Sequence, residues 1–115
     1  MSRLSRINDE IMREAAQIVR AELKDPRIGT LTSVTRAEAT NDLQQCKIYV
    51  SVLGDDSQKK EVMEGLKNAA GFVRKLLAER INLRNTPEVK FVLDESLEHG
   101  MRMDELIRKV REGDS

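Results

Sequence analysis

The sequence predicts an α+β domain in which helices pack on a three-stranded sheet. Its 115 residues suffice for one hydrophobic core and are too few for two. Apolar residues recur at helical spacing in some segments and alternate with polar residues in others. Aromatic residues make up only 3% of the chain, so the core must be aliphatic. We expect a single domain over residues 1–112 and a frayed C-terminus at residues 113–115.

A first helix is expected over residues 4–24. The residues Leu4, Ile7, Ile11, Ala15 and Ile18 share one face because they lie three or four positions apart. Ser5 is the predicted N-cap. The helix should end at Lys24-Asp25-Pro26, since a proline disfavours helical geometry in the residue before it. Gly29 is assigned to the turn that follows.

Two strands should come next and form an antiparallel hairpin. Residues 45–52 alternate strictly, with Cys46, Ile48, Val50 and Val52 on one side, which indicates a strand with one buried face. Residues 31–39 form a weaker strand rich in threonine and valine. Residues 40–42 between them have turn-forming side chains.

The second half of the chain is expected to contain a helix interrupted by a glycine, a third strand and a last helix. Asp55 and Asp56 lie where carboxylates favour a helix N-terminus. Helical spacing then continues to about residue 83, interrupted at its centre by Gly71. Residues 89–93 alternate as a third strand, and residues 96–111 are helix-like. The predicted order is α-β-β-α-(Gly)-α-β-α.

Charge is unevenly distributed along a chain whose formal net charge is zero. Residues 57–90 hold eight basic and four acidic residues. We predict that this segment binds a polyanion backbone, because binding depends on local charge rather than on the total, although solvated surface charges are the alternative interpretation. The predicted contact residues here are Lys67, Gly71, Arg74, Lys75, Arg80, Arg84 and Lys90.

Gly71 is included in this surface because it lacks a Cβ atom, so a polyanion backbone could approach closely. A break there would also start a new helix, whose free N–H groups attract phosphate. A simple helix kink is the alternative interpretation. A second basic stripe is predicted on the first helix, where Arg6, Arg13, Arg20 and Lys24 lie at spacings of seven, seven and four. Ordinary ion pairs such as Arg6 with Glu10 would explain that stripe equally well.

Composition excludes several other classes of protein. The single Cys46 cannot form an internal disulfide, and Cys46 with His99 cannot supply a structural zinc site, so no metal and no cofactor are expected. No apolar run suits a membrane span, and the N-terminus does not resemble a signal peptide, so we expect a cytoplasmic protein without a membrane partner. No phosphate-binding loop or catalytic constellation is found, and an enzyme is disfavoured.

The chain resembles the ribosome-binding factor A family over roughly residues 3–110. The matching segments are Arg3-Leu4-Ser5-Arg6-Ile7, Glu22-Leu23-Lys24-Asp25-Pro26-Arg27-Ile28-Gly29, Asn41-Asp42-Leu43, Cys46-Lys47-Ile48-Tyr49-Val50-Ser51-Val52, Asn68-Ala69-Ala70-Gly71-Phe72-Val73-Arg74, Leu83-Arg84-Asn85-Thr86-Pro87-Glu88, Phe91 and Asp94-Glu95-Ser96. Their joint order and spacing carry the resemblance, since no one of them is decisive.

The resemblance implies a type II KH-like domain. Ala69-Ala70-Gly71 stands where other KH modules carry a Gly-x-x-Gly loop, and it looks like the family's Ala-x-Gly kink. This difference favours recognition of RNA backbone and shape over base reading.

The implied function is that of a bacterial assembly factor. It would bind the free 30S subunit and assist maturation of the 16S rRNA precursor, including in the cold, with an assembly GTPase as a further partner. A monomer is expected. The main alternative is a protein–protein adaptor that docks a ribosomal protein or an assembly GTPase with incidental RNA contact. A small enzyme subunit of ferredoxin-like architecture is a remote third option, for which no titratable cleft is found.

Overall fold

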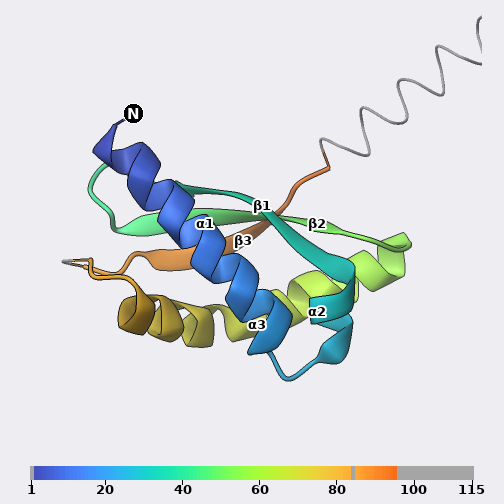
Figure 1. The fold of residues 1–115 in the computed structure, drawn as a ribbon. Helices are drawn as coiled ribbons and strands as arrows, with labels where there is room; N and C mark the ends of the chain where they lie inside the picture. Colours follow the sequence, from blue (N-terminus) through green and yellow to red (C-terminus); the bar gives the residue numbers. More distant parts are fainter. Residues whose placement is uncertain (1, 84, 96–115) are drawn as a thin grey trace, which may run out of the picture.

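The helices of this chain cover one face of a three-stranded sheet (Figure 1). The computed structural model describes residues 2–83 and 85–95. The elements in order are α1 (Arg3–Ala21), α2 (Pro26–Leu31), β1 (Thr32–Ala39), β2 (Gln45–Val52), α3 (Asp56–Arg80) and β3 (Glu88–Leu93). The predicted α+β class is therefore confirmed. The helix expected over residues 96–111 and the frayed end at 113–115 lie outside the described residues.

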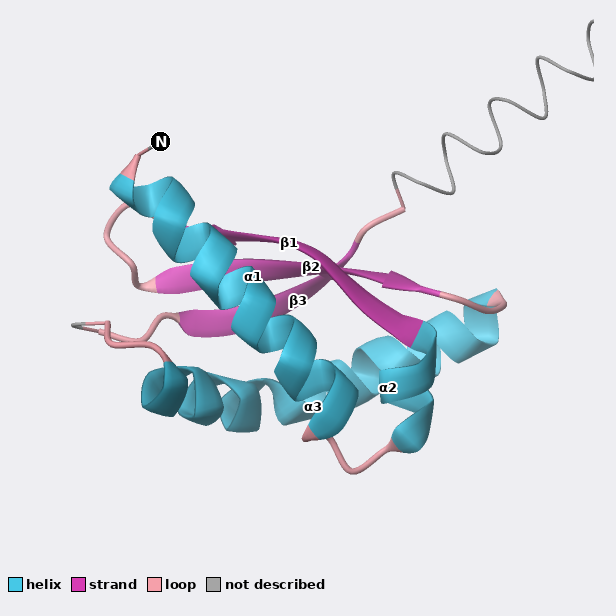
Figure 2. Cartoon of the chain, viewed as in Figure 1, coloured by secondary structure: helices cyan, strands magenta, loops and turns pink. Residues whose placement is uncertain are grey.

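The sheet has the strand order β1-β2-β3. β1 and β2 form the antiparallel hairpin that the alternation predicts, and Ala37 lies opposite Ile48. β3 runs parallel to β2, with Phe91 opposite Ile48. A parallel neighbour requires a long crossover connection, and α3 provides it. The ribbon in Figure 2 shows α1 crossing the sheet and α3 running below it.

The core lies between the sheet and the helices. Each strand contributes alternate residues to it, as the period of two requires, and the helices contribute residues three or four apart. The fully buried members include Ile11, Ala15 and Ile18 of α1, Cys46, Ile48 and Val50 of β2, and Leu66 and Val73 of α3. Burying each large aliphatic side chain contributes roughly 1.5–3 kcal/mol. Only Phe91 among the aromatic residues is buried, so the core is aliphatic as expected.

The ends of the first helix differ from the prediction. Ser2, not Ser5, is the N-cap: the backbone N–H of Ser5 donates to the Ser2 hydroxyl at 3.1 Å. The cap was misassigned because apolar spacing identifies the buried face of a helix but does not show which of two nearby serines caps it. The helix ends at Ala21 rather than near residue 24, with Glu22 as its C-cap.

A short helix that the sequence did not predict follows this end. α2 begins at Pro26, and the Asp25 side chain caps it by accepting a hydrogen bond from the Arg27 N–H at 3.0 Å. Gly29 lies inside this helix, so its assignment to a turn was wrong. A Cβ atom on Gly29 would lie 3.0 Å from the carbonyl oxygen of Arg20. The glycine is therefore needed for close packing of α2 against α1.

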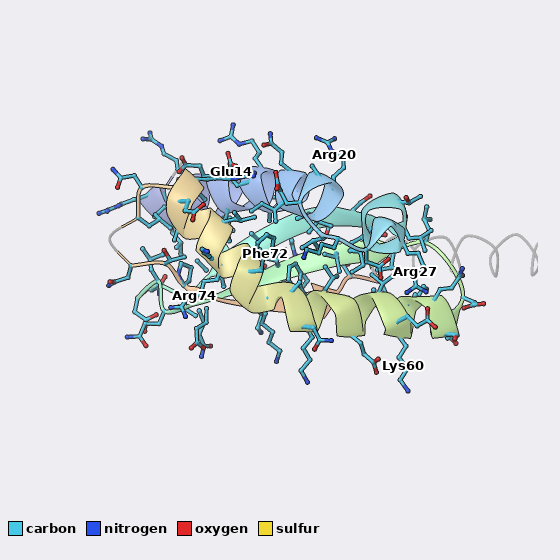
Figure 3. The ribbon with its side chains drawn as sticks, turned by 90° about the horizontal axis from the view of Figure 1, so that it is seen from below. Glu14, Arg20, Arg27, Lys60, Phe72 and Arg74 are labelled. Atoms are coloured by element: carbon cyan, nitrogen blue, oxygen red, sulfur yellow. The ribbon has the colours of Figure 1, made fainter. Side chains whose placement is uncertain are left out.

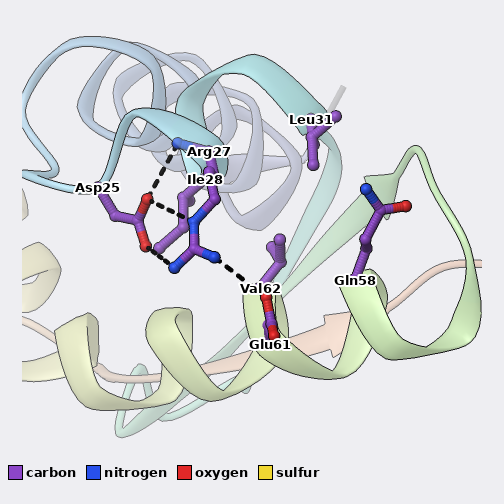
Figure 4. A pocket seen from close by; sticks show the side chains of 7 residues that line it. All are labelled: Asp25, Arg27, Ile28, Leu31, Gln58, Glu61 and Val62. Atoms are coloured by element: carbon purple, nitrogen blue, oxygen red, sulfur yellow. Dashed lines mark hydrogen bonds and ion pairs between the residues drawn. The ribbon is translucent and has the colours of Figure 1, made fainter.

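Arg27 joins α2 to α3 through a small polar junction (Figure 4). Its guanidinium donates to Asp25 and, at 3.1 Å, to Glu61 of α3. The same guanidinium holds the pKa of the Asp25 carboxyl below its ordinary value, because hydrogen bonds stabilise the ionised form. The adjoining hollow measures about 100 Å³. This junction fixes the start of α3 relative to α2.

α3 is one helix from Asp56 to Arg80, which corrects the expected break at Gly71. It begins with a capping box, in which Asp55 accepts from the Gln58 N–H while the Gln58 side chain accepts from the Asp55 N–H. Figure 3 shows the helix changing direction near Phe72, next to Gly71. Because no second helix starts at Gly71, the free N–H groups that we expected there do not exist.

Candidate nucleic-acid interface

A groove of about 610 Å³ runs between α3 and the edge strand β3. Its residues are Lys60, Met63, Glu64, Lys67, Ala70, Val89, Lys90 and Phe91. Three of these side chains are cationic and one is anionic, so the groove carries a local surplus of positive charge. The remaining side chains are apolar. Such a groove offers ammonium groups to phosphates and an apolar surface to sugars or bases.

The two elements that flank the groove place its lysines by their own periodicity. Lys60 and Lys67 lie seven residues apart on α3, which is close to two helical turns, so they share one side of the helix. Lys90 belongs to β3, whose parallel pairing with β2 brings it alongside α3. All three lysines are exposed to solvent. The structure thus brings the predicted Lys67 and Lys90 together.

Arg74 lies seven residues beyond Lys67 on the same side of α3, and it lines a neighbouring hollow with Thr86 and Glu88 rather than the groove itself. Its guanidinium donates to the carbonyl oxygen of Thr86, from Nε at 3.3 Å and from Nη2 at 3.0 Å. The acceptor in both bonds is a neutral carbonyl group, so these bonds do not neutralise the positive charge. Arg74 therefore both holds the segment before β3 and extends the basic surface.

The region around Gly71 is open to solvent. A Cβ atom built on Gly71 would have nothing within 4 Å, so no other described element covers this part of α3. Ala70 lines the groove, Ala69 is half-buried, and Lys75 is exposed on the following turn. Although the free N–H groups are missing, the close approach that we predicted for a polyanion backbone remains sterically possible.

Arg80 lies elsewhere. It forms ion pairs with Glu22 at 3.1 Å and with Glu14 at 3.7 Å, and so it connects the end of α3 to α1. In helical projection it is roughly on the opposite side of α3 from Lys67, since thirteen residues separate them. The structure does not bring Arg80 to the groove. Arg84 lies outside the described residues.

Arg6, Arg13 and Arg20 are exposed on α1, as the seven-residue spacing predicts. Figure 3 shows Arg20 and Lys60 on opposite sides of the molecule. The α1 stripe and the groove are therefore two separate basic surfaces. An RNA that touches both must extend around the protein.

Lys60 is the groove residue that the sequence-based prediction missed. It lies within residues 57–90 but outside residues 67–84, where Glu79 is the one acidic residue among five basic ones. Its spacing of seven from Lys67, repeated between Lys67 and Arg74, was the available signal. The apolar residues of β3 that face the groove could not be assigned to it from the sequence, because nothing local indicates which helix lies beside the strand.

Other chemistry is not supported in the part of the chain that the structure describes. Across residues 2–83 and 85–95, no three histidine, cysteine or acidic side chains gather as a metal site would require. Burial raises the pKa of the Cys46 thiol to about 11, so the thiol stays protonated and unreactive at neutral pH. Within the same residues, no helix is long and apolar enough to cross a membrane.

Comparisons with a family model and with individual sequences all match the same family. A sequence model described as Ribosome-binding factor A matches residues 3–107. A protein of Lachnospira eligens with that name is 50% identical over 111 residues, covering 96% of this chain and 85% of the relative. The protein of the same name from Clostridium novyi is 46% identical, covering 96% of this chain and 91% of the relative.

Comparison with solved structures supports the same fold. A Thermotoga maritima protein, described as a putative ribosome binding factor A, superposes with a TM-score of 0.70 at 30% identity and covers 80% of this chain and 87% of its own. Ribosome-binding factor A from Thermus thermophilus gives a TM-score of 0.71 at 22% identity, covering 80% and 97%. A second set of Thermus thermophilus coordinates, with a TM-score of 0.63 at 22% identity and coverage of 76% and 91%, is described as fitted into a map of a 30S complex. The fold is KH-like.

Proposed function

Because the chain belongs to the ribosome-binding factor A family, we propose that it binds the free 30S subunit and assists maturation of the 16S rRNA precursor, including in the cold. The family is one of ribosome-binding factors rather than of a known enzyme class. The complex described for the Thermus thermophilus relative supports the 30S subunit as the partner.

The observation that carries the proposal is the basic groove between α3 and β3. Lys60, Lys67 and Lys90 surround it, and only Glu64 opposes them among its lining residues. Its position beside the Ala-x-Gly segment agrees with a surface that follows an RNA backbone. Ammonium groups contact phosphates as point charges and carry no sequence information, so recognition would depend on RNA shape.

The proposed contact surface keeps the residues predicted from the sequence and adds Lys60. Its first part consists of the groove residues Lys60, Lys67 and Lys90, together with Gly71, Arg74 and Lys75 on the adjoining turns of α3. Its second part, on α1, consists of Arg6, Arg13 and Arg20. Arg80 and Arg84 complete the predicted set. An assembly GTPase as a partner, a monomeric state, a cytoplasmic location and a single domain over residues 1–112 belong to the same proposal.

Sedimentation through a sucrose gradient tests the function directly. The protein should travel with free small subunits and be absent from intact ribosomes. Cells depleted of it should accumulate unprocessed 16S rRNA precursor, and more so at low temperature. Co-sedimentation with intact ribosomes instead of free subunits would contradict the proposal.

A charge-reversal variant tests the surface. The double change Lys67→Glu and Lys75→Glu should weaken binding to free small subunits and flatten its salt dependence, by roughly one in the log–log slope for each phosphate that the variant no longer neutralises. Arg36→Glu with Lys47→Glu is the charge-matched control, because both residues are exposed on β1 and β2 and lie outside the proposed surface. Equal affinity and slope for the double variant and the control would remove the groove from the interface.

Digestion of the subunit RNA separates this proposal from the adaptor alternative. An RNA-binding factor should lose its partner when the subunits are treated with ribonuclease before capture. Retention on the remaining ribosomal proteins would favour a protein–protein adaptor. The same experiment with the double variant shows whether any retained binding uses the groove.

A further inference from the structure

One aromatic ring on this protein is left exposed. Phe91 is buried, with 9% of its surface accessible. Tyr49 is covered by the Arg36 guanidinium, 4.0 Å from the ring centroid, and its hydroxyl donates to Glu38. Phe72, by contrast, is 45% exposed. Since the chain has one Tyr, two Phe and no Trp, Phe72 is the aromatic side chain with the freest ring.

A single exposed phenylalanine is common on protein surfaces and does not by itself indicate a binding site, so its surroundings decide the interpretation. It lies where α3 changes direction (Figure 3), directly after the open Gly71. Lys75 is three residues further along the helix and Asn68 four residues before, so both flank the ring on the surface. An exposed aromatic ring is thus placed beside a cation and an uncovered stretch of helix.

These neighbours favour a nucleotide over an apolar protein surface as the occupant. An apolar partner that covered Phe72 would have to desolvate Lys75 and Asn68, at a cost that one ring cannot offset. Glu79, which is exposed two turns further along α3, would repel a phosphate, so the phosphate should lie on the Lys75 side of the ring. A nucleotide brings a base for the ring and a phosphate for the ammonium group together. Every base has a face that can stack, so such an interaction suits recognition without sequence reading.

Phe72 lies five residues from Lys67, about 140° around α3, so the ring faces away from the groove. We propose that Phe72 stacks on an unpaired base of an RNA whose backbone leaves the groove at Lys67 and crosses the outer side of α3 over Gly71 and Lys75. This inference rests on the proposed function, because it concerns the same RNA. A chain with only 3% aromatic residues has few rings that could stack on bases, so the proposed contact uses this one ring. The aromatic platform is a single residue, placed next to the cations that hold the adjacent phosphates.

Substitutions at Phe72 test the stacking in the full-length chain, with purified free small subunits as the binding partner. Phe72→Ala should weaken binding roughly 5- to 100-fold, the range found for the loss of one stacked base. The slope of affinity against salt should stay unchanged, since no charge is removed. Phe72→Trp should bind at least as tightly as the natural chain, and Phe72→Leu should resemble Phe72→Ala.

Leu53→Ala is the matched control. Leu53 is the other large exposed apolar residue in the described part of the chain, at 68%, and it precedes α3 at the opposite end from Phe72. Its loss should leave binding unchanged. Thermal unfolding of each variant should match the natural chain closely, because neither side chain is buried.

The Trp variant also gives a direct signal. The natural chain has no tryptophan, so Phe72→Trp introduces a single indole at the proposed stacking site. Its fluorescence should be quenched when subunits are added, after subtraction of a mixture that contains the natural chain. Unquenched fluorescence on binding would place the ring away from any base.

The other outcomes are equally decisive. If Phe72→Leu binds as well as the natural chain, the interaction is apolar packing and base stacking is wrong. If Phe72→Ala binds normally while Lys67→Glu with Lys75→Glu does not, stacking is wrong and the proposed RNA surface survives. If all these variants bind normally, the proposed surface itself is wrong.

Discussion

The guanidinium of Arg74 donates two hydrogen bonds to the carbonyl oxygen of Thr86, at 3.3 Å from Nε and 3.0 Å from Nη2. This pair of bonds links α3 to the segment that leads into β3, the two elements that also form the groove. The forked guanidinium can make both bonds, whereas a lysine ammonium offers a single charged point. Arg74 therefore combines a structural role with an available positive charge.

The two roles of Arg74 can be separated by two substitutions. Arg74→Lys should keep the salt dependence of subunit binding, because the charge remains. It should lower the free energy of unfolding by about 1 kcal/mol, because lysine cannot make the paired hydrogen bonds to Thr86. Arg74→Met should lower both the stability and the salt slope. Chemical denaturation and binding at several salt concentrations measure the two effects, and identical behaviour of Lys and Met would show that the charge has no role.

Gly71 should show opposite effects on stability and binding. A Cβ atom at this position meets nothing within 4 Å, and the residue is inside a helix, so Gly71→Ala should raise the free energy of unfolding by about 1 kcal/mol. The added methyl group should nevertheless weaken subunit binding, since it occupies the path of an approaching RNA backbone. Thermal unfolding and affinity measurements check this pair, and unchanged affinity would show that the backbone does not come close.

The α1 stripe should act independently of the groove if RNA contacts both. Replacing Arg6, Arg13 and Arg20 by glutamine should then reduce the log–log salt slope by up to roughly three, and the loss should add to that of the groove variant. The two sets lie on separate surfaces, so no shared partner should make them non-additive. An unchanged slope for the triple variant would confine RNA to the α3 side.

Arg80 should matter for stability more than for binding. Its guanidinium pairs with Glu14 and Glu22 of the α1 segment, and its side chain is 29% exposed. Arg80→Gln should lower the free energy of unfolding by about 1 kcal/mol, because partial burial strengthens the ion pairs beyond typical surface values. Denaturant titration measures this change. A normal stability together with a large loss of subunit affinity would show that Arg80 acts mainly in RNA binding.

Cys46 should make the protein less stable at alkaline pH. Burial raises its pKa from about 9 to about 11, since the folded state disfavours the thiolate. Below pH 9 the thiol is protonated in both states and contributes no slope. Between pH 9 and 11 the unfolded chain loses the proton first, so the free energy of unfolding should fall by roughly 2 kcal/mol.

Cys46→Val is the control for that slope, because other groups also titrate in this range. It keeps an apolar side chain of similar size on the buried face of β2. The difference between the two stability profiles isolates the thiol. Parallel profiles from pH 8 to pH 11 would show that the pKa of Cys46 is not raised.

Most elements of this fold follow from periodicity. The alternation at Cys46, Ile48, Val50 and Val52 predicts β2 with its buried face, and the structure confirms it. The hairpin, the third strand and the two long helices are predicted in the correct order. α2 was missed because six residues are too few to show a helical period, and Asp25 before a proline is equally typical of a helix end.

The predicted surface changed more than the predicted fold. Local composition identifies a basic segment that includes Lys67 and Arg80, and the structure separates these two residues to different sides of α3. A helix turns each residue by about 100°, so neighbours in sequence face different directions. Lys90 joins the groove because β3 pairs in parallel with β2 and comes to lie beside α3.

The order of the long helices and the strands, the aliphatic core and the family could thus be predicted from the sequence alone, because spacing and composition are local properties. Only the tertiary structure shows which residues line the groove, which carboxylates pair with Arg80, and that Phe72 is exposed. Each of these depends on packing between residues far apart in sequence, and strand order and helix placement set that packing.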